Sequence, residues 1–380
     1  MTDVVLVSLE AWDAVWRRNQ YLVAEMLRAD PALRFLVVEP AADPLFALRR
    51  GRAPRTGRGL RPAPAVDGVA AGRLWLYQPT KPLPRRLDHR ADERLARATV
   101  RAARRLGMSP VLWVNDPAAA TLLRDSGWPA LYDVTDDWLA AERTAAEHGR
   151  LVRDEGVLLE RCAEVVVCSP GLAATKGAAR PVTLISNAVD VGRYRAPHAR
   201  PEDLPESPVA LYLGTVHPDR FDVGLLEATA RAVHGHGSVV LVGPVVDVAR
   251  EDRARLEEIG VQLLGARDWR SVPAYLQHAD VLIVPHVVDA FTDSLDPIKL
   301  YEYLAAGRPV VSTPVAGFRD RSDPQVRVVA PADFPGAVRA TLRSRAPTAD
   351  VPPDVPTWTA RAVDMADVVA RCVRPPARRP

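Results

Sequence analysis

The sequence predicts an α/β protein made of two doubly wound parallel-sheet domains in tandem. Short, continuous apolar runs alternate with longer amphipathic stretches, which is the pattern of buried parallel strands and crossover helices. At 380 residues the chain is longer than one hydrophobic core usually serves. A proline-rich stretch at 197–208 divides the pattern into two series and is expected to be a linker. We therefore expect domains at 1–195 and 205–350, followed by a helix at 357–373.

The first series accounts for the N-terminal domain. Its expected strands are short apolar runs at residues 4–8, 34–38, 74–78, 111–115, 130–134, 165–169 and 182–186. The helices between them are expected at 12–28, 91–106 and 138–162.

The second series repeats the same alternation after the linker. Its strands are expected at 209–214, 239–243, 261–265, 281–285 and 310–313, with helices at 223–234, 250–259 and 297–306. In such sheets the functional groups gather at the carboxyl ends of the strands, so the loops after the strands are the places to search.

Composition restricts the class of protein. A hydrophobic content of 48% is typical of a soluble globular protein, and a net charge of +3 is too small to indicate nucleic-acid binding. No apolar run approaches the roughly 20 residues that span a bilayer, and the first residues lack the basic region of a signal peptide. The three cysteines have no metal-ligand spacing and are expected to be reduced and buried. These features predict a cytoplasmic monomer or homodimer.

Arginines are concentrated in one segment of the first series, between residues 49 and 61. They are Arg49, Arg50, Arg52, Arg55, Arg58 and Arg61, set among glycines and prolines. The interpretation that we favour is a mobile, solvated loop. The alternative is an electrostatic guide for an anionic acceptor or for an acidic membrane surface, which would make the protein a peripheral membrane protein.

The richest segment of the second series is 293–311. Pro297 opens a short helix and Gly307 ends it, because proline presets φ and glycine tolerates the left-handed conformation. Lys299 and Glu302 are three residues apart and therefore share one helical face. A base and an acid at a helix N-terminus suit a ligand that carries both phosphates and hydroxyls.

This segment resembles the nucleotide-sugar site of GT-B glycosyltransferases of the family 4 type (glycosyl transferases group 1), with its Pro-x-Lys-x-x-Glu-Tyr-Leu-Ala-x-Gly-x-Pro-Val-Val run. The resemblance implies two Rossmann-like domains facing across a cleft, with the C-terminal helix crossing back to the N-terminal domain, where Trp358 is its expected anchor. It also implies transfer of a sugar from a nucleotide-diphospho-sugar such as a UDP or GDP sugar. Retention of configuration is implied, without a metal or other cofactor.

The resemblance gives expected roles to the residues of this segment. Glu302 matches the second acid of the family's spaced pair, which accepts hydrogen bonds from the ribose hydroxyls. The first acid falls at Ser294 and is missing, so either Asp293 or Asp296 supplies the contact or the donor sugar lacks that hydroxyl. Lys299 is either a phosphate ligand or a partner of Glu302. The loop residues Ser294, Leu295 and Asp296 are accordingly placed at the donor.

The loop after the first strand of the second series resembles the family's phosphate-binding loop. Gly214 lets the backbone approach a phosphate, but Thr215 stands where relatives carry an arginine. Arg220 is the expected substitute for stabilising the leaving diphosphate. The structural alternative is that Arg220 pairs with Asp219 or Asp222.

Two further segments are matched in the same way. In the loop at 264–269, Arg267 or Trp269 is expected to stack on the nucleobase, and Trp269 is equally compatible with core packing. The run Asn187-Ala188-Val189-Asp190, followed by Tyr194, resembles the family's junction between domains, where Ala188 replaces the usual glycine. We interpret this run as a structural turn.

The acceptor is expected in the N-terminal domain. The candidates follow its strands and are Trp12, Asp13, Arg17, Asn115, Asp116, Asp136 and Asp137. Asp133 with Asp136 and Asp137 also permits a metal site, which the resemblance disfavours, or caps for a helix that begins at Trp138.

The acceptor class stays open at this point. It is either a cell-surface polysaccharide or lipid-linked intermediate, or a bacterial natural product. Two alternative functions also stay open. A nucleotide-sugar epimerase uses the same fold without an acceptor, and a catalytically silent subunit of a glycosyltransferase would explain the missing acid and arginine.

Overall fold

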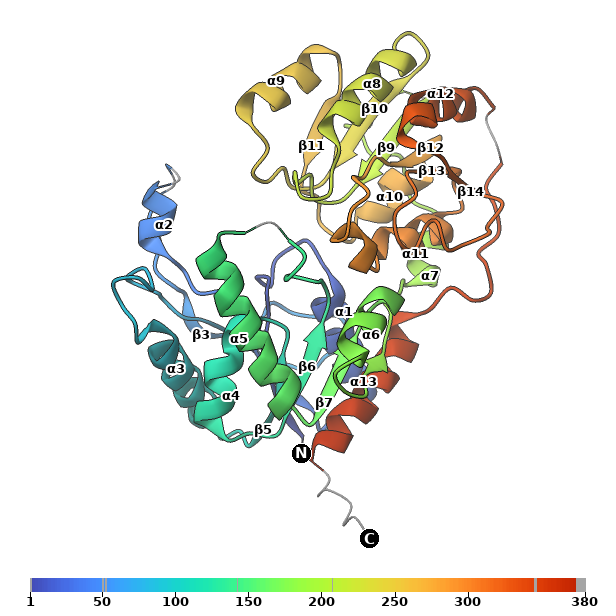
Figure 1. The fold of residues 1–380 in the computed structure, drawn as a ribbon. Coiled ribbons are helices and arrows are strands. Elements are labelled where there is room, and N and C mark those ends of the chain that lie inside the picture. Colours follow the sequence, from blue (N-terminus) through green and yellow to red (C-terminus); the bar gives the residue numbers. More distant parts are fainter. Residues whose placement is uncertain are drawn as a thin grey trace. The chain divides into compact units, whose positions relative to one another are not determined.

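The computed structural model describes residues 2–49, 51, 53–141, 143–206, 208–344 and 347–373. Its internal contacts divide the chain into two compact units (Figure 1). Unit 1 consists of Met1–Asp13, Arg17–Ile185 and Thr359–Pro380, and unit 2 consists of Ala14–Trp16 and Ser186–Trp358. This division does not test the domain bounds expected from the sequence, which remain a prediction.

Unit 1 is built on an eight-stranded sheet of order β3-β4-β2-β1-β5-β6-β7-β8. The strands are β1 (Asp3–Val7), β2 (Arg34–Val38), β3 (Gly59–Pro62), β4 (Leu74–Gln78), β5 (Pro110–Val114), β6 (Ala130–Val134), β7 (Glu164–Val167) and β8 (Thr183–Leu184). All neighbours pair in parallel except β3, which runs antiparallel to β4 at the edge. The strand order reverses between β1 and β5, which makes their carboxyl ends the topological switch point.

Helices on this sheet follow the βαβ rule for parallel strands. The helical elements are α1 (Arg18–Ala29), α2 (Pro44–Arg49), α3 (Ala91–Arg105), η1 (Pro117–Ala119), α4 (Ala120–Ser126), α5 (Ala145–Arg161), α6 (Pro170–Gly177) and, from the C-terminus, α13 (Trp358–Cys372). Apolar residues of α3, α4 and α5 form one buried cluster with one face of the central strands (Figure 1). The three cysteines are buried and are not joined in disulfides, as predicted.

Unit 2 repeats the doubly wound pattern with six parallel strands of order β11-β10-β9-β12-β13-β14. They are β9 (Val209–Leu213), β10 (Ser238–Val242), β11 (Gln262–Gly265), β12 (Val281–Val284), β13 (Val310–Ser312) and β14 (Val326–Val328). The order reverses between β9 and β12, which gives unit 2 its own switch point.

The helices of unit 2 divide its core into two layers. The helical elements are α7 (Val191–Arg195), α8 (Val223–Val233), α9 (Arg250–Glu258), α10 (Val272–Gln277), η2 (Thr292–Ser294), α11 (Ile298–Ala306), η3 (Pro331–Asp333) and α12 (Phe334–Ser344). Residues of α10 and α11 are buried on one face of the sheet, and those of α8 and α12 on the other. Gly307 ends α11 in the left-handed conformation at φ +69, as expected.

The C-terminal helix groups with unit 1 from Thr359 onward, as the predicted crossover requires. Arg371 in its last turn forms an ion pair with Glu164 at the start of β7, with 2.9 Å between Nη2 and Oε2. Trp358 is buried but groups with unit 2. Its expected role as the anchor of this helix on the first domain is therefore wrong.

Two helix starts in unit 1 differ from the sequence prediction. The first helix begins at Arg18 and not at residue 12, and the third begins at Ala145 and not at residue 138. Thr144 explains the second start, because its hydroxyl accepts from the Glu147 amide while the Glu147 carboxylate accepts from the Thr144 amide. Apolar periodicity alone extended both helices into the loops that precede them.

The arginine-rich segment is partly ordered, so the interpretation as a mobile, solvated loop is wrong for its second half. Arg61 lies in β3, and it forms an ion pair with the buried Glu39 at 2.5 Å. Arg58 approaches the same carboxylate at 3.1 Å. These two cations neutralise a carboxylate that is fully covered, which is a structural role. Arg50 and Arg52 lie outside the described residues.

Across the part of the chain that the structure describes, none of the helices combines the length and the apolar character needed to cross a membrane.

Candidate active site

The switch point of unit 2 is built around two glycines. Gly214 follows β9 at φ +136, and Gly243 follows β10 at φ +146. The Gly214 amide donates to the Val242 carbonyl at 2.9 Å, which brings the two loops together. A Cβ on Gly243 would lie 2.1 Å from the Gly214 carbonyl oxygen, so only glycine fits there.

Lys299, in the first turn of α11, lies against this loop. Its Nζ donates to the Tyr212 hydroxyl at 2.8 Å and lies 3.1 Å from His286 Nε2. A Cβ on Gly214 would be 3.0 Å from this Nζ. The amine therefore lies beside the backbone that the sequence predicted to approach a phosphate.

Lys299 has no carboxylate ion-pair partner among the described residues. Burial lowers the pKa of the Lys299 amine well below its usual value, and the nearby Arg220 charge lowers it further. An anion entering this space would reverse the effect, because it would offer the amine the missing counter-charge.

His286 was not identified in the sequence analysis. It follows β12, and its Nε2 lies 3.1 Å from the Tyr212 hydroxyl as well as from Lys299 Nζ. Burial lowers the pKa of the ring well below its usual value, and the charges of Lys299 and Arg220 add to this. A neutral imidazole can accept a hydrogen bond from the amine. The signal for His286 was its place directly after an apolar strand and Pro285.

Glu302 lies one turn further along α11 and takes a hydrogen bond from another element. The Tyr194 hydroxyl donates to its Oε1 at 2.6 Å, whereas Oε2 has no hydrogen-bond partner among the described residues. Burial raises the pKa of the Glu302 carboxyl, opposed by the Tyr194 hydrogen bond and the Lys299 charge. The carboxylate thus keeps acceptor capacity for a ligand hydroxyl.

The polar side chains of the loop before α11 mostly form hydrogen bonds and ion pairs with other groups of the protein. Ser294 is buried and its hydroxyl donates to the Phe291 carbonyl at 2.7 Å. Asp296 accepts from the Tyr301 hydroxyl at 2.7 Å and from the Asn187 amide. Asp293 pairs with Arg319 at 2.6 Å. Because of these bonds, neither Asp293 nor Asp296 is well suited to replace the missing acid. Leu295 is partly exposed.

The junction run is structural but is not the turn that we expected, because Val189 forms a parallel bridge with Thr357 and its amide donates to the Pro356 carbonyl at 3.1 Å. Asp190 caps α7 through the Arg193 amide at 3.1 Å. Among the described residues, Asp247 is the one non-glycine with a positive φ, so Ala188 adopts ordinary backbone and needs no glycine.

Arg220 has the surface partner that the structural alternative named. Its Nε lies 3.1 Å from Asp219 Oδ1, and its Cζ lies 5.6 Å from the Phe291 ring centroid. Its charge is close enough to lower the pKa values of Lys299 and His286. Thr215 contributes its carbonyl, which accepts from the Tyr212 hydroxyl at 3.1 Å. The catalytic role of Arg220 stays a prediction.

The two residues expected at the nucleobase are engaged within unit 2. Arg267 donates to the Tyr275 hydroxyl at 2.9 Å and pairs with Asp203 at 2.5 Å. Trp269 is buried, with the Trp16 ring stacked at 4.0 Å and Arg193 Cζ 3.7 Å from its centroid. Its ring is covered, so the core-packing alternative fits better than stacking on a base.

In unit 1 the buried polar groups divide into separate clusters. Asp133 is held by the Arg18 guanidinium through two contacts of 3.2 Å and by Trp113 Nε1 at 3.2 Å. Asn115 accepts from Asn19 at 2.9 Å and donates to the Asp133 carbonyl at 3.1 Å. The hydrogen bonds of both side chains go to neighbouring protein groups, so these two residues hold the ends of the strands together.

The other two aspartates do not join Asp133. Asp137 pairs at 3.0 Å with Lys176, which also pairs with Glu155, and Asp136 accepts from Thr135 at 3.1 Å. The predicted capping of a helix at Trp138 is wrong, because that helix begins later. Among the residues that the structure describes, no group of three or more histidines, cysteines or carboxylates is placed to hold a metal ion.

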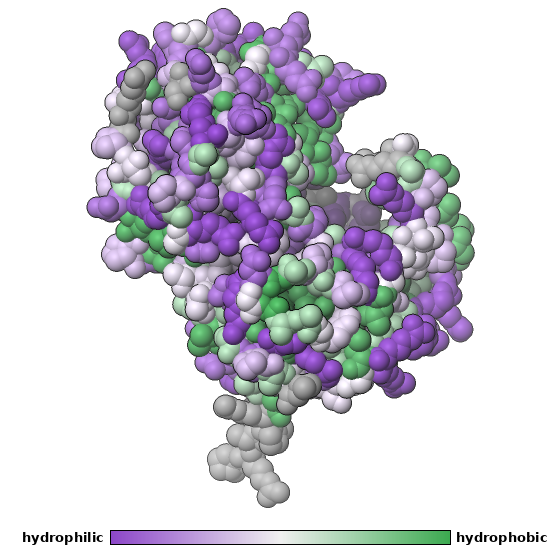
Figure 2. All heavy atoms as spheres, turned by 180° about the vertical axis from the view of Figure 1, so that it is seen from behind, coloured by the Kyte–Doolittle hydropathy of each residue, from purple (hydrophilic) through white to green (hydrophobic). Residues whose placement is uncertain are grey.

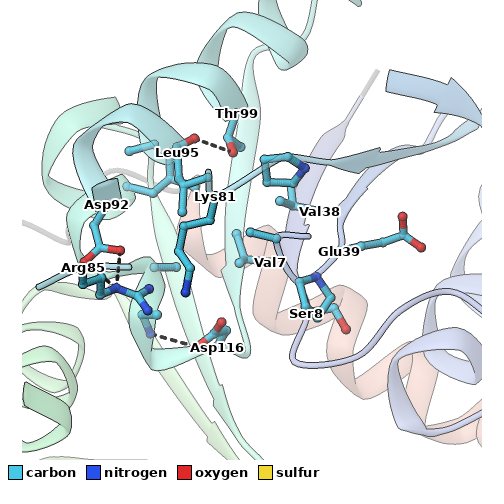
Figure 3. A pocket seen from close by; sticks show the side chains of 17 residues that line it. Val7, Ser8, Val38, Glu39, Lys81, Arg85, Asp92, Leu95, Thr99 and Asp116 are labelled. Carbon is cyan, nitrogen blue, oxygen red and sulfur yellow. Dashed lines mark hydrogen bonds and ion pairs between the residues drawn. The ribbon is translucent and has the colours of Figure 1, made fainter. Parts of the chain in front are cut away.

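The remaining candidates for binding the acceptor lie in different surroundings and do not form one site. Trp12 is buried, with its amide bonded to Glu39 at 3.0 Å. Arg17 pairs with Glu10 at 3.2 Å and with Asp13 at 3.5 Å. Asp116 lines a cavity of about 240 Å³ at the switch point of unit 1 (Figure 3).

Comparison with known families and structures agrees with the fold. Residues 207–344 match the family described as glycosyl transferases group 1. Sucrose-phosphate synthase from Thermosynechococcus elongatus is similar over 98% of this chain and 99% of its own, with a TM-score of 0.66 at 17% identity. The HepE protein of Anabaena, solved in complex with UDP and glucose, is similar over 97% of this chain and 100% of its own, with a TM-score of 0.62 at 13% identity. At these identities the structures show the fold, which is GT-B.

A curated relative is the putative teichuronic acid biosynthesis glycosyltransferase TuaH of Bacillus subtilis (strain 168). It is 24% identical over 244 residues, which cover 59% of this chain and 60% of the relative. The match thus spans about three fifths of the relative's length.

Proposed function

The chain carries a domain of the glycosyl transferases group 1 family on a GT-B fold, and from this premise we propose that it is a glycosyltransferase that uses a nucleotide-diphospho-sugar donor. The observation that carries the proposal is the arrangement at the switch point of unit 2. The Gly214 backbone after β9 lies beside the Lys299 amine of α11, and the Glu302 carboxylate lies one turn further along the same helix. A phosphate needs the first two, and a ribose hydroxyl needs the third.

In the proposed reaction the bond between the anomeric carbon and the diphosphate oxygen breaks, and a bond to the acceptor oxygen forms. Lys299 and Arg220 stabilise the charge that develops on the departing diphosphate. The acceptor hydroxyl passes its proton to that leaving group. With attack on the face that the diphosphate leaves, configuration is retained. Support for retention and for metal independence comes from the sequence resemblance.

The donor is proposed to be a UDP or GDP sugar. The similarity to HepE, which was solved with UDP and glucose, supports UDP. The acceptor is proposed to belong to cell-surface polysaccharide synthesis, which the similarity to the putative teichuronic acid glycosyltransferase TuaH supports. A natural-product acceptor is the second possibility, and the cavity beside Asp116 in unit 1 bears on the choice.

Peripheral contact with a membrane is part of the proposal for a lipid-linked acceptor. Three apolar residues of α2, Leu45, Phe46 and Leu48, are exposed beside Arg49. On the face shown in Figure 2, hydrophobic residues occur in small groups between hydrophilic ones. Co-sedimentation with anionic vesicles at low salt tests this contact, and a protein that stays in the supernatant would contradict it.

The proposed donor site is tested by calorimetry with UDP, GDP, dTDP, ADP and CDP. One diphosphate should bind, and Glu302→Ala should weaken it by about 1–3 kcal/mol through the lost charged hydrogen bonds. Glu258→Ala, on the exposed end of α9, is the matched control and should bind like the wild type. No binding by any diphosphate would refute the donor site and favour the silent subunit. Conversion of a donor without an acceptor would favour the epimerase.

A further inference from the structure

The cavity of unit 1 lies where its strand order reverses. Val7 and Ser8 reach it from the end of β1, Val38 and Glu39 from the end of β2, and Asp116 from the end of β5. Residues of α3 cover it from one face of the sheet (Figure 3). A crevice at this position of a doubly wound sheet is a usual place for a ligand.

The side chains that line the cavity have both hydrogen-bond donors and a hydrogen-bond acceptor available for a ligand. Arg85 Nε contacts both oxygens of Asp92 at 2.8 and 3.1 Å, and its two Nη groups have no protein partner among the described residues. Lys81 uses one N–H on Asp43 at 2.7 Å, which leaves two. Asp116 Oδ1 accepts the Ala118 amide at 2.9 Å, and no partner for Oδ2 is present in the described chain.

The charges around these groups are already balanced. Three carboxylates, Asp43, Asp92 and Asp116, face two cations, Lys81 and Arg85. Glu39 with its two partners, Arg58 and Arg61, adds one positive charge, which offsets the third carboxylate. An anionic ligand would upset this balance, whereas a neutral polyol can donate to Asp116 and accept from Arg85 and Lys81.

Size and the remaining lining agree with one sugar ring. A cavity of about 240 Å³ has room for roughly eight waters at about 30 Å³ each. This space matches one ring, and the cavity is open to solvent, so further parts of a larger ligand would lie outside it. Leu95, Ala118 and Leu122 supply apolar surface for the C–H groups of the ring.

We propose that this cavity binds a neutral, hydroxylated monosaccharide unit of the acceptor, held by Arg85, Lys81 and Asp116. The inference rests on the proposed function and deepens it, because it selects a carbohydrate acceptor over an aromatic natural product. Arg85, Lys81 and Asp116 act as binding residues and take no part in bond making.

The experiment uses the full chain and saturation-transfer NMR with neutral methyl glycosides of glucose, galactose, mannose and N-acetylglucosamine. Glucuronate and inorganic phosphate are the anionic probes. A ligand of this size should bind with a Kd on the order of millimolar. At least one neutral glycoside should bind, and Arg85→Met and Ala118→Leu should each weaken it about tenfold or more. Ala118→Leu fills the cavity, and Arg85→Met tests the same site without adding volume.

Arg86→Met is the matched control, since Arg86 is exposed, adjoins Arg85 and does not line the cavity. It should bind the glycoside like the wild type. Preferred binding of glucuronate or phosphate would overturn the neutral class. Loss of glycoside binding in Glu302→Ala but not in Arg85→Met would place the sugar in unit 2 and also overturn the inference.

Failure of the inference and failure of the proposed function give different results. Nucleotide binding is measured on the same preparation. If a diphosphate binds but no glycoside does, with or without that diphosphate, the inference is wrong and the donor site stands. If no diphosphate binds, the proposed function fails whatever the glycosides do.

Discussion

Two lysines of this protein, the buried Lys176 and the partly exposed Lys299, have opposite effects on the stability of the fold. Lys176 lies 2.7 Å from Glu155 and 3.0 Å from Asp137, and the net effect of these partners is to raise its pKa despite the burial that opposes it. Among the described residues, Lys299 has the neutral side chains of Tyr212 and His286 as its hydrogen-bonding neighbours, and burial lowers its pKa. A side chain kept without a counter-charge at a cost in stability is a mark of a binding site.

The first prediction concerns Lys299→Met. The folded pKa of Lys299 is below the unfolded value of about 10.5, so the unfolded state binds more protons between the two and the lysine destabilises the fold at neutral pH. The variant should therefore raise Tm by about 2–4 °C at pH 7, with a gain that shrinks as pH rises toward 10.5, while losing diphosphate affinity. Lys176→Met should lower Tm. Calorimetry over a pH series measures both, and a lower Tm for Lys299→Met would contradict the argument.

The second prediction concerns His286. Its folded pKa is below the unfolded value of about 6.5, so the unfolded state takes up the proton first as pH falls. Stability should decline as pH drops below about 6.5, and His286→Gln should flatten that decline while keeping a hydrogen-bonding side chain. Urea unfolding at pH 7.5 and at pH 5.5 gives the two slopes. Equal slopes in the wild type and the variant would show that His286 does not contribute.

At the scale of the elements, the donor-side loop depends on how closely β9 and β10 end together. The Gly214 amide donates to the Val242 carbonyl and the Gly243 amide donates to the Gly265 carbonyl, each at 2.9 Å, so the ends of β9, β10 and β11 are linked in succession. The backbone hydrogen bonds to the neighbouring strand ends therefore hold the loop after β9 in place without a ligand. A phosphate site needs this kind of preorganisation.

The third prediction compares two glycines with positive φ. Gly243→Ala should destabilise unit 2 by about 3 kcal/mol or more and abolish diphosphate binding, because the new Cβ would clash with the Gly214 carbonyl. Gly260→Ala shares the strain of a positive φ, at +89, but has no atom within 4 Å of the new Cβ. It should cost only about 1–2 kcal/mol. Urea unfolding and calorimetry with the diphosphate separate these effects, and similar losses in both variants would refute the clash.

At the scale of the whole molecule, each unit has its own sheet and its own buried clusters. Unit 1 also contains a buried ion pair beneath its switch point, Arg18 with Asp133, which are 5% and 0% exposed as side chains. An ion pair of this kind is costly to break from one side, since the other charge remains buried.

The fourth prediction is that the chain unfolds in two calorimetric transitions, one for each unit. Arg18→Met should lower the free energy of unfolding of unit 1 by about 3–5 kcal/mol, which lowers the temperature of one transition. Gly243→Ala should lower the temperature of the other. Arg18→Met combined with Asp133→Leu should recover most of the first loss, because both charges are removed. A single transition that both single variants shift equally would show that the units unfold as one.

The apolar runs and the segment 297–307 predicted much of the molecule correctly. Parallel strands are buried on both faces and helix stops need particular residues, so local composition determines them. Helix starts at Arg18 and Ala145 were missed, because a loop that carries apolar residues continues the periodicity of the helix. Several further elements were also missed, namely α2, α4, α6, α7, α10, α12, β3 and β14. Apart from α12 they have eight residues or fewer, which give too little pattern to recognise.

The sequence by itself determined the doubly wound architecture, which depends on local signals: strand burial and helix periodicity. The resemblance of two segments to the family 4 type predicted that Lys299, Glu302 and Gly214 share a donor site, and the structure brings Lys299 to Gly214. Only the tertiary structure decided which charged groups are already paired. It assigned Asp133 to Arg18, Asp296 to Asn187 and Tyr301, and Arg58 and Arg61 to Glu39. It also brought His286 to Lys299 and opened the cavity beside Asp116. The physical reason is that such pairings join residues far apart in the chain, and no periodicity records them.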